Sequence, residues 1–311
     1  MHPVLELIHH RHSTGSQPLH RTDNARLAVV LEGGSSRAAF GGGMVSVLEE
    51  LELLHTIDAV YGSSAGALNG AWLVCQRVRA NIHGWWAPET MGAIIRPRNA
   101  LRRRPVVNGD ALVDEVYETL TPMGYEEILA SDVEYHPTGT DADTGASTDL
   151  APFIHDKRTL QLALKATTRL PVLSGPPVEL GGRRFIDGGL AEGVPVAMAL
   201  AQGATHLLVL RTRAAQLAPI RTHPLKQRAV SRWLARHAAG ASETWISRNQ
   251  TKLELEQMMA SAPNILQVHP PADAPSISVV GQSAEVQERA VRMGEVAMRE
   301  ALQSAGTSAA D

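Results

Sequence analysis

The chain contains a single cysteine, Cys75, so it has no internal disulfide bond. This usage is typical of a protein that folds in a reducing compartment. No apolar run approaches the roughly 18 residues that a membrane-spanning helix needs, and the first residues lack the apolar core of a signal peptide. We therefore expect a cytoplasmic protein whose contact with a membrane, if there is one, is peripheral.

A strong charge of one sign and the usual phosphate-binding loops are also missing. The formal net charge is −3, which argues against a nucleic-acid-binding protein. The glycine-rich stretch at Gly33 has neither the Gly-x-Gly-x-x-Gly spacing of a dinucleotide fold nor the Gly-Lys-Ser/Thr of a P-loop. Hydrophobic residues make up 44% of the chain, enough for a large core without covalent or metal cross-links.

Apolar runs that alternate with helical patterns predict an α/β fold. Residues 27–31 form a continuous apolar run, typical of a buried parallel strand. Further strands are expected at about 57–61, 133–136, 205–210 and 264–268, and 178–187 is expected to form a hairpin. Helices are expected at about 38–51, 65–80, 157–168, 195–202, 224–260 and 283–304.

This alternation predicts a three-layer sandwich, with a mostly parallel central sheet and helices on both faces. We expect one domain over 25–304, with polar, mobile tails at 1–24 and 305–311. Three consecutive glycines, 41–43, lie within the first expected helix, where each costs about 1 kcal/mol relative to alanine. Another backbone or a substrate is therefore expected to approach this helix closely.

The most informative stretch is Gly62-Ser63-Ser64-Ala65-Gly66, between an expected strand and an expected helix. In this context the Gly-x-Ser-x-Gly pattern places a serine hydroxyl at the apex of a strained turn. The adjacent helix N-terminus favours developing negative charge, and Gly62 and Gly66 allow tight packing of the elbow. The pattern indicates Ser64 as a nucleophile, the alternative being a turn that only connects the two elements.

A serine nucleophile needs hydrogen-bond donors for the oxyanion. The best candidate is the loop Gly33-Gly34-Ser35-Ser36-Arg37, between the strand at 27–31 and the helix that follows. Ligands of open α/β sheets bind at the carboxyl ends of the strands. Because Ser64 follows the next strand, we expect the two loops to lie side by side.

Asp187 is the strongest candidate for the base. It follows a strand-like run and precedes Gly188-Gly189, which let the chain turn away from the carboxylate. A buried aspartate beside Ser64 would have a raised pKa and accept the serine proton, whereas a solvated Asp-Gly-Gly turn is the alternative. A histidine base in a Ser-His-Asp esterase is the rival hypothesis, with four candidates: His136, His206, His223 and His269.

Together these motifs resemble the patatin-like phospholipase family over about residues 25–300. The family's Gly-Gly-Gly-x-Arg-Gly loop matches 33–38, its Gly-x-Ser-x-Gly elbow matches 62–66, and its Asp-Gly-Gly/Ala motif matches 187–189. The resemblance implies a Ser-Asp dyad without histidine, cofactor or metal. Ser64 would be the nucleophile, Asp187 the base, and Gly33, Gly34 and the backbone of 35–37 the oxyanion hole.

The reaction that the resemblance implies is hydrolysis of fatty-acyl esters in phospholipids, lysophospholipids or neutral lipids through an acyl-enzyme. The chain departs from the family pattern at two positions. Ser35 replaces the third glycine, and Ala38 replaces the glycine after Arg37. If residue 35 adopts a positive φ, serine carries a conformational cost there. A weakly active or non-catalytic lipid-binding protein is therefore the second hypothesis.

The expected partner is a lipid or another acyl ester, and not a nucleic acid. Five arginines lie between the elbow helix and residue 108: Arg96, Arg98, Arg102, Arg103 and Arg104. We favour a solvated basic loop for this cluster, the alternative being attraction to anionic headgroups or a membrane surface. The sequence does not indicate an oligomeric state.

Overall fold

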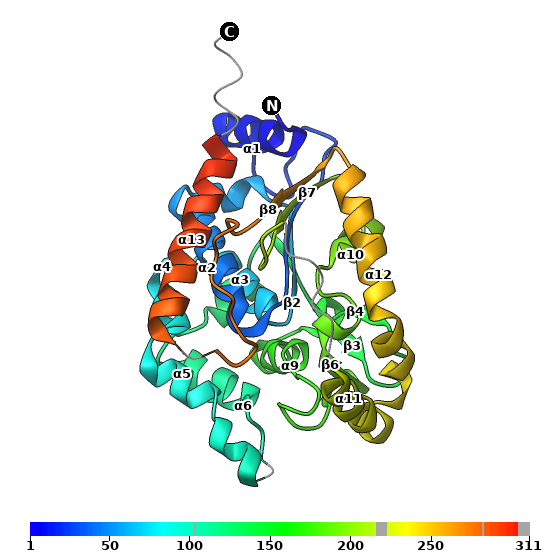
Figure 1. Ribbon diagram of the computed structural model, residues 1–311. Helices are drawn as coiled ribbons and strands as arrows, with labels where there is room; N and C mark the ends of the chain where they lie inside the picture. Colours follow the sequence, from blue (N-terminus) through cyan, green and yellow to red (C-terminus); the bar gives the residue numbers. More distant parts are fainter. Residues whose placement is uncertain (103, 216–222, 282, 304–311) are drawn as a thin grey trace.

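One sheet runs through the centre of the molecule (Figure 1). The computed structural model describes residues 1–102, 104–215, 223–281 and 283–303. Within these residues the strand order is β5-β6-β3-β2-β1-β7-β8, with β4 paired to β3. The strands are β1 (Leu27–Leu31), β2 (Ala59–Ser63), β3 (Glu134–Asp141), β4 (Ser147–Asp149), β5 (Val178–Leu180), β6 (Arg183–Asp187), β7 (His206–Leu210) and β8 (Ile265–Val268).

The predicted mostly parallel sheet is confirmed. Strands β3, β2, β1, β7 and β8 pair in parallel with their neighbours in that order. Strands β4, β5 and β6 are antiparallel, and β5 and β6 form the expected hairpin. The parallel strands bring the loops after β1 and β2 to the same edge of the sheet, as the motif spacing predicted.

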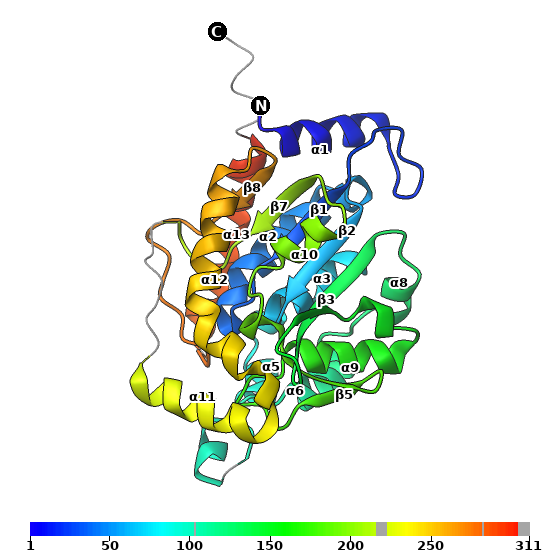
Figure 2. The ribbon, with the colours of Figure 1, turned by 90° about the vertical axis from the view of Figure 1, so that its right-hand side faces the viewer.

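Helices cover both faces of the sheet, which confirms the three-layer sandwich (Figures 1 and 2). One face carries α2 (Ala39–Glu50), α3 (Ala65–Val74) and α13 (Ala284–Gln303), and the other carries α10 (Val196–Ala201) and α12 (Ser242–Ser261). Helix α9 (Lys157–Thr167) packs against β3, β5 and β6. The remaining α-helices are α1 (Pro3–Thr14), α4 (Val78–Asn81), α5 (Pro88–Ile94), α6 (Gly109–Ala111), α7 (Tyr117–Thr119), α8 (Tyr125–Leu129) and α11 (Pro224–His237).

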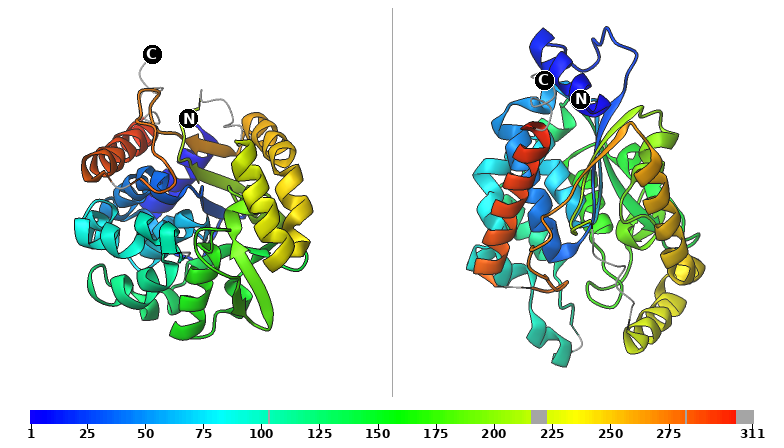
Figure 3. Two further views of the ribbon diagram at one scale, coloured as in Figure 1. Left: turned by 60° about the horizontal axis from the view of Figure 1, so that its bottom comes forward. Right: turned by 45° about the horizontal axis from the view of Figure 1, so that its top comes forward.

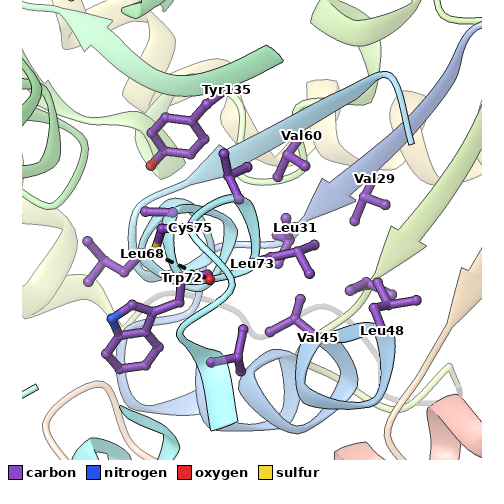
Figure 4. Close-up of a cluster of buried hydrophobic side chains, with 14 of the residues drawn as sticks. Val29, Leu31, Val45, Leu48, Val60, Leu68, Trp72, Leu73, Cys75 and Tyr135 are labelled. Carbon is purple, nitrogen blue, oxygen red and sulfur yellow. Dashed lines mark hydrogen bonds between the residues drawn. The ribbon is translucent and has the colours of Figure 1, made fainter. Parts of the chain in front are cut away.

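The largest apolar cluster fixes α3 to the sheet (Figure 4). Strands β1 and β2 supply Val29, Leu31 and Val60, and the facing helices supply Val45, Leu48, Leu68, Trp72 and Leu73. Full burial of one such side chain contributes about 1.5–3 kcal/mol. The Tyr135 hydroxyl adds a 2.7 Å hydrogen bond to the carbonyl oxygen of Ala67. The start of α3, which carries the elbow, is therefore rigidly held.

The glycines of α2 allow another helix to touch its backbone. A Cβ on Gly43 would clash with the carbonyl oxygen of Val291 on α13, and a Cβ on Gly294 of α13 would clash with the carbonyl oxygen of Phe40 on α2. The expectation of a close approach is thus confirmed, and the approaching element is a backbone, that of α13.

The N-terminal segment differs from the expected polar, mobile tail. Residues 3–14 form α1, whose Val4, Leu5 and Ile8 are buried. Arg11 is 0% exposed and pairs with Asp23 and Asp58, each at 2.7 Å. This segment therefore packs against the rest of the domain through Val4, Leu5, Ile8 and Arg11 of α1. The expected tail 305–311 lies outside the described residues.

Three helix or strand boundaries also differ. The helix expected over 224–260 is two helices, α11 and α12, because Gly240 between them passes directly against the backbone of Asp143. The helix expected over 65–80 ends at Val74, and Gln76 with φ 53° separates it from α4. Strand β3 continues to Asp141 through residues expected in a turn, because β4 and β6 pair with it there.

Candidate active site

Ser64 forms the turn between β2 and α3. Its backbone has φ 53° and ψ −132°, a conformation that L residues rarely adopt, so the turn is strained. The elbow glycines lie where the chain touches itself. A Cβ on Gly62 would overlap with the backbone of Ala67, and one on Gly66 would lie 2.6 Å from the carbonyl oxygen of Leu31. Both positions therefore need glycine for this tight turn.

Asp187, at the end of β6, faces Ser64. The Ser64 hydroxyl donates a 2.7 Å hydrogen bond to Oδ2 of Asp187, and the N–H of Gly189 donates to Oδ1 at 2.9 Å. Ser64 and Asp187 are 5% and 4% exposed, so the alternative of a solvated Asp-Gly-Gly turn is wrong. Gly188 packs against the carbonyl oxygen of Thr138 on β3, which leaves no room for a side chain.

The environment of Asp187 makes its carboxylate a stronger base than a free aspartate. Burial raises the pKa of Asp187 to about 6, although the hydrogen bonds from Ser64 and Gly189 oppose this rise. At pH 7 the carboxylate is thus mostly ionised, yet its affinity for a proton is far above that of a solvated aspartate. This combination suits a general base that takes the proton of the hydroxyl it contacts.

The loop predicted to bind the oxyanion lies beside Ser64. A Cβ on Gly33 would be 3.2 Å from the Cβ of Ser64. The N–H of Gly33 is already bound to the carbonyl oxygen of Gly193 at 2.9 Å, and the N–H of Arg37 is bound to that of Gly34 at 3.1 Å. These two N–H groups are therefore occupied within the protein.

The remaining three residues of that loop keep free donors. The N–H groups of Gly34, Ser35 and Ser36 have no acceptor in the part of the chain that the structure describes. Ser35 has φ 51°, in the left-handed region that favours glycine. Its hydroxyl donates to the carbonyl oxygen of Val279 at 2.6 Å, and this contact helps to hold the serine in that conformation.

Thr167, at the end of α9, was not predicted as a site residue. Its side-chain oxygen accepts a 2.9 Å hydrogen bond from the backbone N–H of Ser64. The sequence predicted the helix but offered no signal that this one threonine contacts the elbow. Ala38, the second departure from the family loop, has a buried methyl group, and its carbonyl oxygen accepts from Asn69 at 2.8 Å.

The candidate histidines do not hydrogen-bond to Ser64 in the described structure. His136 lies between Asp149 and Glu134, at 2.8 and 3.0 Å, and stacks on Tyr61. His206 contacts Thr205 at the opposite edge of the sheet, and His269 contacts the backbone of Arg213. His223 lines a groove that also contains Ser64, but its side chain caps α11.

Ser64 lies where two cavities meet. One is lined mainly by apolar side chains, among them Leu68, Trp72, Met91, Ile94, Val107 and Leu112. The other is a polar groove that includes Glu32, Arg37, Asp187, Arg213, Lys252 and Glu256. Ser35 and Ser64 line both. Ser64 is thus flanked by an apolar space on one side and a charged one on the other.

The described residues contain no group of three or more histidine, cysteine or acidic side chains suited to a metal ion. None of their helices has the length and apolar character needed to cross a bilayer.

Comparison with known proteins gives related sequences over most of the chain. Uncharacterized protein YjjU of Escherichia coli (strain K12) is 24% identical over 263 residues, 82% of this chain and 71% of that protein. Uncharacterized NTE family protein Mb1092c of Mycobacterium bovis is 22% identical over 222 residues, 71% of this chain. The chain spans only 58% of the length of that mycobacterial protein. Among solved structures, VipD from Legionella pneumophila has a TM-score of 0.46 at 12% identity, covering 91% of this chain and 67% of that one.

A family model described as patatin-like phospholipase matches residues 29–200. This stretch, more than half of the chain, runs from β1 to α10 and contains the glycine-rich loop, the serine elbow and Asp187 in the expected order. The chain belongs to the patatin-like phospholipase family.

Proposed function

We propose that this protein is a lipid acyl hydrolase in which Ser64 and Asp187 form a catalytic dyad. The observation that carries the proposal is the 2.7 Å hydrogen bond between the strained, buried serine and a buried aspartate with a raised pKa. Membership of the patatin-like phospholipase family supports lipid esters as the substrate class.

In the proposed reaction, Ser64 Oγ attacks the acyl carbonyl carbon while Asp187 accepts the hydroxyl proton. The proton then passes to the departing alcohol oxygen as its bond to the acyl carbon breaks. Asp187 next takes a proton from water, whose oxygen attacks the acyl-enzyme, and the proton returns to Ser64 as the fatty acid leaves. One carboxylate thus serves both half-reactions without net gain or loss of protons.

The free N–H groups of Gly34 and Ser35 are the proposed oxyanion donors, together with that of Ala65. Ala65 is the first residue of α3, and its N–H has no hydrogen-bond acceptor in the described chain. A helix N-terminus adds a favourable dipole for negative charge. Loss of one such donor typically lowers the rate about 10²- to 10³-fold.

The two cavities suggest how the ester is oriented. An acyl chain gains free energy by leaving water for apolar surroundings, at about 25 cal/mol per Å² buried. We therefore assign the acyl chain to the apolar cavity beside Leu68 and Trp72 and the alcohol portion to the polar groove. Ser64, shared by both, then faces the ester bond between them.

We also propose peripheral contact with an anionic membrane through two basic arms that flank the site. The first arm consists of residues 96–107, and the second arm is α11. Each arm lies within a longer stretch of sequence that has no acidic residue, 90–109 for the first arm and 193–242 for the second. Their described cations are Arg96, Arg98, Arg102 and Arg104 on the first arm and Lys226, Arg228, Arg232 and Arg236 on the second. Arg103 lies outside the described residues.

The arms lie on opposite sides of the same end of the molecule, the end away from α1 (Figures 1 and 3). Each also exposes a large apolar side chain, Leu101 at 90% and Leu225 at 68%. The chain as a whole has a net charge of −3, so the positive charge of the two arms is concentrated at this end of the molecule. Basic residues near an anionic bilayer contribute about 1 kcal/mol each to binding.

A fluorophosphonate probe tests the nucleophile. The wild type and Ser63→Ala should be labelled, whereas Ser64→Ala should not. Ser63 is a matched control because its buried hydroxyl has no hydrogen-bond partner among the described residues, so its loss removes no hydrogen bond. Equal labelling of wild type and Ser64→Ala would refute the assignment. An unlabelled wild type that nevertheless binds lipid would favour the second hypothesis, a non-catalytic lipid-binding protein.

Hydrolysis of a panel of phospholipids, lysophospholipids and neutral glycerides then tests the activity itself. We expect fatty acid release by wild type and Ser63→Ala, and none by Ser64→Ala or Asp187→Asn. If Asp187→Asn retained full turnover while a histidine variant lost it, a Ser-His-Asp esterase would replace the dyad.

A further inference from the structure

The apolar cavity beside Ser64 runs along one side of α3. Ala65, Leu68 and Trp72 line it and follow Ser64 by one, four and eight positions, so all three lie on the same face of the helix. Leu68 and Trp72 project from the side of α3 that faces away from Leu31 (Figure 4). The cavity therefore follows the helix from Ser64, at its N-terminus, toward the indole of Trp72.

The far end of this cavity is closed by four buried residues that all line it. The rings of Trp72 and Tyr117 meet edge to face, with their centroids 5.9 Å apart. A Cβ on Gly84 would lie 2.8 Å from Cγ2 of Thr121 and 3.6 Å from Cη2 of Trp72. Trp72, Tyr117 and Thr121 are 4%, 3% and 0% exposed, and Gly84 is buried as well. The cavity thus ends against these residues, away from the solvent.

The helix also gives the length of this space. Each residue of an α-helix advances about 1.5 Å, and helical side chains lean toward the N-terminus by about one position. The indole of Trp72 therefore lies about 10–12 Å beyond Ser64 along the helix axis. A fully extended chain advances about 1.2 Å per bond, since three bonds of a polypeptide span about 3.3–3.6 Å. The space between Ser64 and Trp72 thus holds an extended acyl chain of about eight to ten carbons.

We infer that Trp72 limits the length of the acyl chain, so that esters of medium-chain acids are preferred over those of long-chain acids. The inference rests on the proposed function and deepens it, since it names the acyl group that the cavity accepts. Each CH₂ group that enters the cavity leaves water, which is favourable until the chain meets the indole. A longer chain must then displace packed rings, which is unfavourable in a well-packed interior. Trp72 is therefore a specificity-determining residue outside the motifs that carry the proposed dyad.

The first test measures kcat/KM for p-nitrophenyl esters with acyl chains from acetyl to palmitoyl, each below its critical micelle concentration. For the wild type, kcat/KM should rise by up to about fourfold per CH₂ group as far as decanoyl. It should then fall by about tenfold or more toward palmitoyl. Trp72→Ala should move the maximum to longer chains, because it opens the closed end of the cavity. A maximum at palmitoyl in the wild type, or an unchanged maximum in Trp72→Ala, would overturn the inference.

Three further variants on α3 separate cavity length from stability. Leu68 lies one turn beyond Ser64, so Leu68→Trp should block the cavity halfway and move the maximum to about four or five carbons. Trp72→Phe loses no hydrogen bond, since the indole nitrogen has no partner among the described residues, and should shift the maximum less than Trp72→Ala does. Leu73, which is buried but lines neither cavity, supplies the matched control. Leu73→Ala should lower the Tm and keep the maximum, and a shift equal to that of Trp72→Ala would refute the length limit.

Fatty acid binding separates this inference from the proposed function. In Ser64→Ala, decanoate should raise the Tm more than palmitate does at the same concentration, and adding Trp72→Ala should reverse this order. If the wild type hydrolyses no ester, the proposed function fails, and the order of the two Tm shifts still decides whether Trp72 limits chain length. If esters are hydrolysed but neither Leu68→Trp nor Trp72→Ala changes the preferred chain, the acyl chain lies elsewhere and this inference alone fails.

Discussion

The backbone N–H of Ser64 donates to the side-chain oxygen of Thr167, at 2.9 Å and out of contact with water. Thr167 is 0% exposed and ends α9, which packs against the strand that carries Asp187. One helix therefore contacts both Ser64 and the strand that carries Asp187. Since the elbow is strained, this hydrogen bond helps to hold Ser64 at its apex.

Thr167→Val should weaken both the fold and the reaction. The change keeps the shape but leaves a buried N–H without an acceptor, which costs about 1–3 kcal/mol. We expect a lower Tm and a kcat reduced about tenfold on a soluble ester. Thr167→Ser, which keeps the hydroxyl, should stay close to the wild type. Equal behaviour of the valine and serine variants would show that the hydrogen bond does not position the nucleophile.

The pH dependence of kcat/KM should report Asp187. The carboxylate must be ionised to accept the serine proton, and its pKa is about 6. Activity should therefore be constant above pH 7 and fall as the pH drops through about 6, with a limiting slope of tenfold per pH unit. If this fall in kcat/KM at low pH instead disappeared in His223→Gln, a histidine in the groove would be the base.

Asp187→Asn should be inactive but more stable than the wild type at neutral pH. The pKa of Asp187 is raised in the folded protein, so its favourable contribution is complete below about pH 4 and is lost as the pH rises through about 6. The neutral amide of Asp187→Asn does not lose this contribution, so the free energy of unfolding of this variant should exceed that of the wild type by about 1–3 kcal/mol at pH 8. Urea unfolding at pH 8 and pH 5 should show that the extra stability of Asp187→Asn over the wild type is smaller at the lower pH. A variant less stable than the wild type at pH 8 would contradict the raised pKa.

Ser35 can be tested by separating its strain from its hydrogen bond. Ser35→Gly relieves the positive φ but loses the contact with Val279, so its stability should change by less than about 1 kcal/mol. Ser35→Ala keeps the strain and loses the contact, and should be the least stable and least active of the three. A glycine variant many times faster than the wild type would instead mean that serine at 35 impairs the oxyanion loop.

Membrane contact predicts binding that depends on charge and needs no catalysis. Ser64→Ala should sediment with vesicles of phosphatidylserine and phosphatidylcholine, and much less with phosphatidylcholine alone. Adding Arg98→Glu and Arg228→Glu, one on each arm, should reduce binding more than tenfold, as should high salt. The matched charge reversals Arg289→Glu and Arg292→Glu on α13 should not reduce vesicle binding. If both pairs of variants lost binding equally, the proposal that the two arms contact the membrane would be wrong.

Local patterns in the sequence predicted the strands and turns that position Ser64 and Asp187. The apolar run 27–31, the elbow and the hairpin ending at Asp187 each carry their signal within a few residues. The inference that two loops meet needed only one rule of parallel sheets, that consecutive strands end at the same edge.

Contacts between distant segments could not be predicted in this way. Arg11 is buried because two aspartates and two carbonyl oxygens surround it, and nothing near it in the sequence indicates that. Similarly, α11 and α12 separate at Gly240 because another part of the backbone passes there. Arg213 and Lys252 lie outside the recognisable motifs, yet the fold brings both into the groove that Ser64 lines.

The contact between Ser35 and Val279 joins residues 244 positions apart. During synthesis Ser64 and then Asp187 leave the ribosome long before residue 279, since chains emerge from the N-terminus at about 5–20 residues per second. Strand β7, which flanks β1 on the side away from β2, also follows both. A chain that stops before residue 279 thus carries Ser64 and Asp187 without the segment that contacts Ser35. The loop 33–37 can take up its folded conformation only after nearly the whole chain has been synthesised.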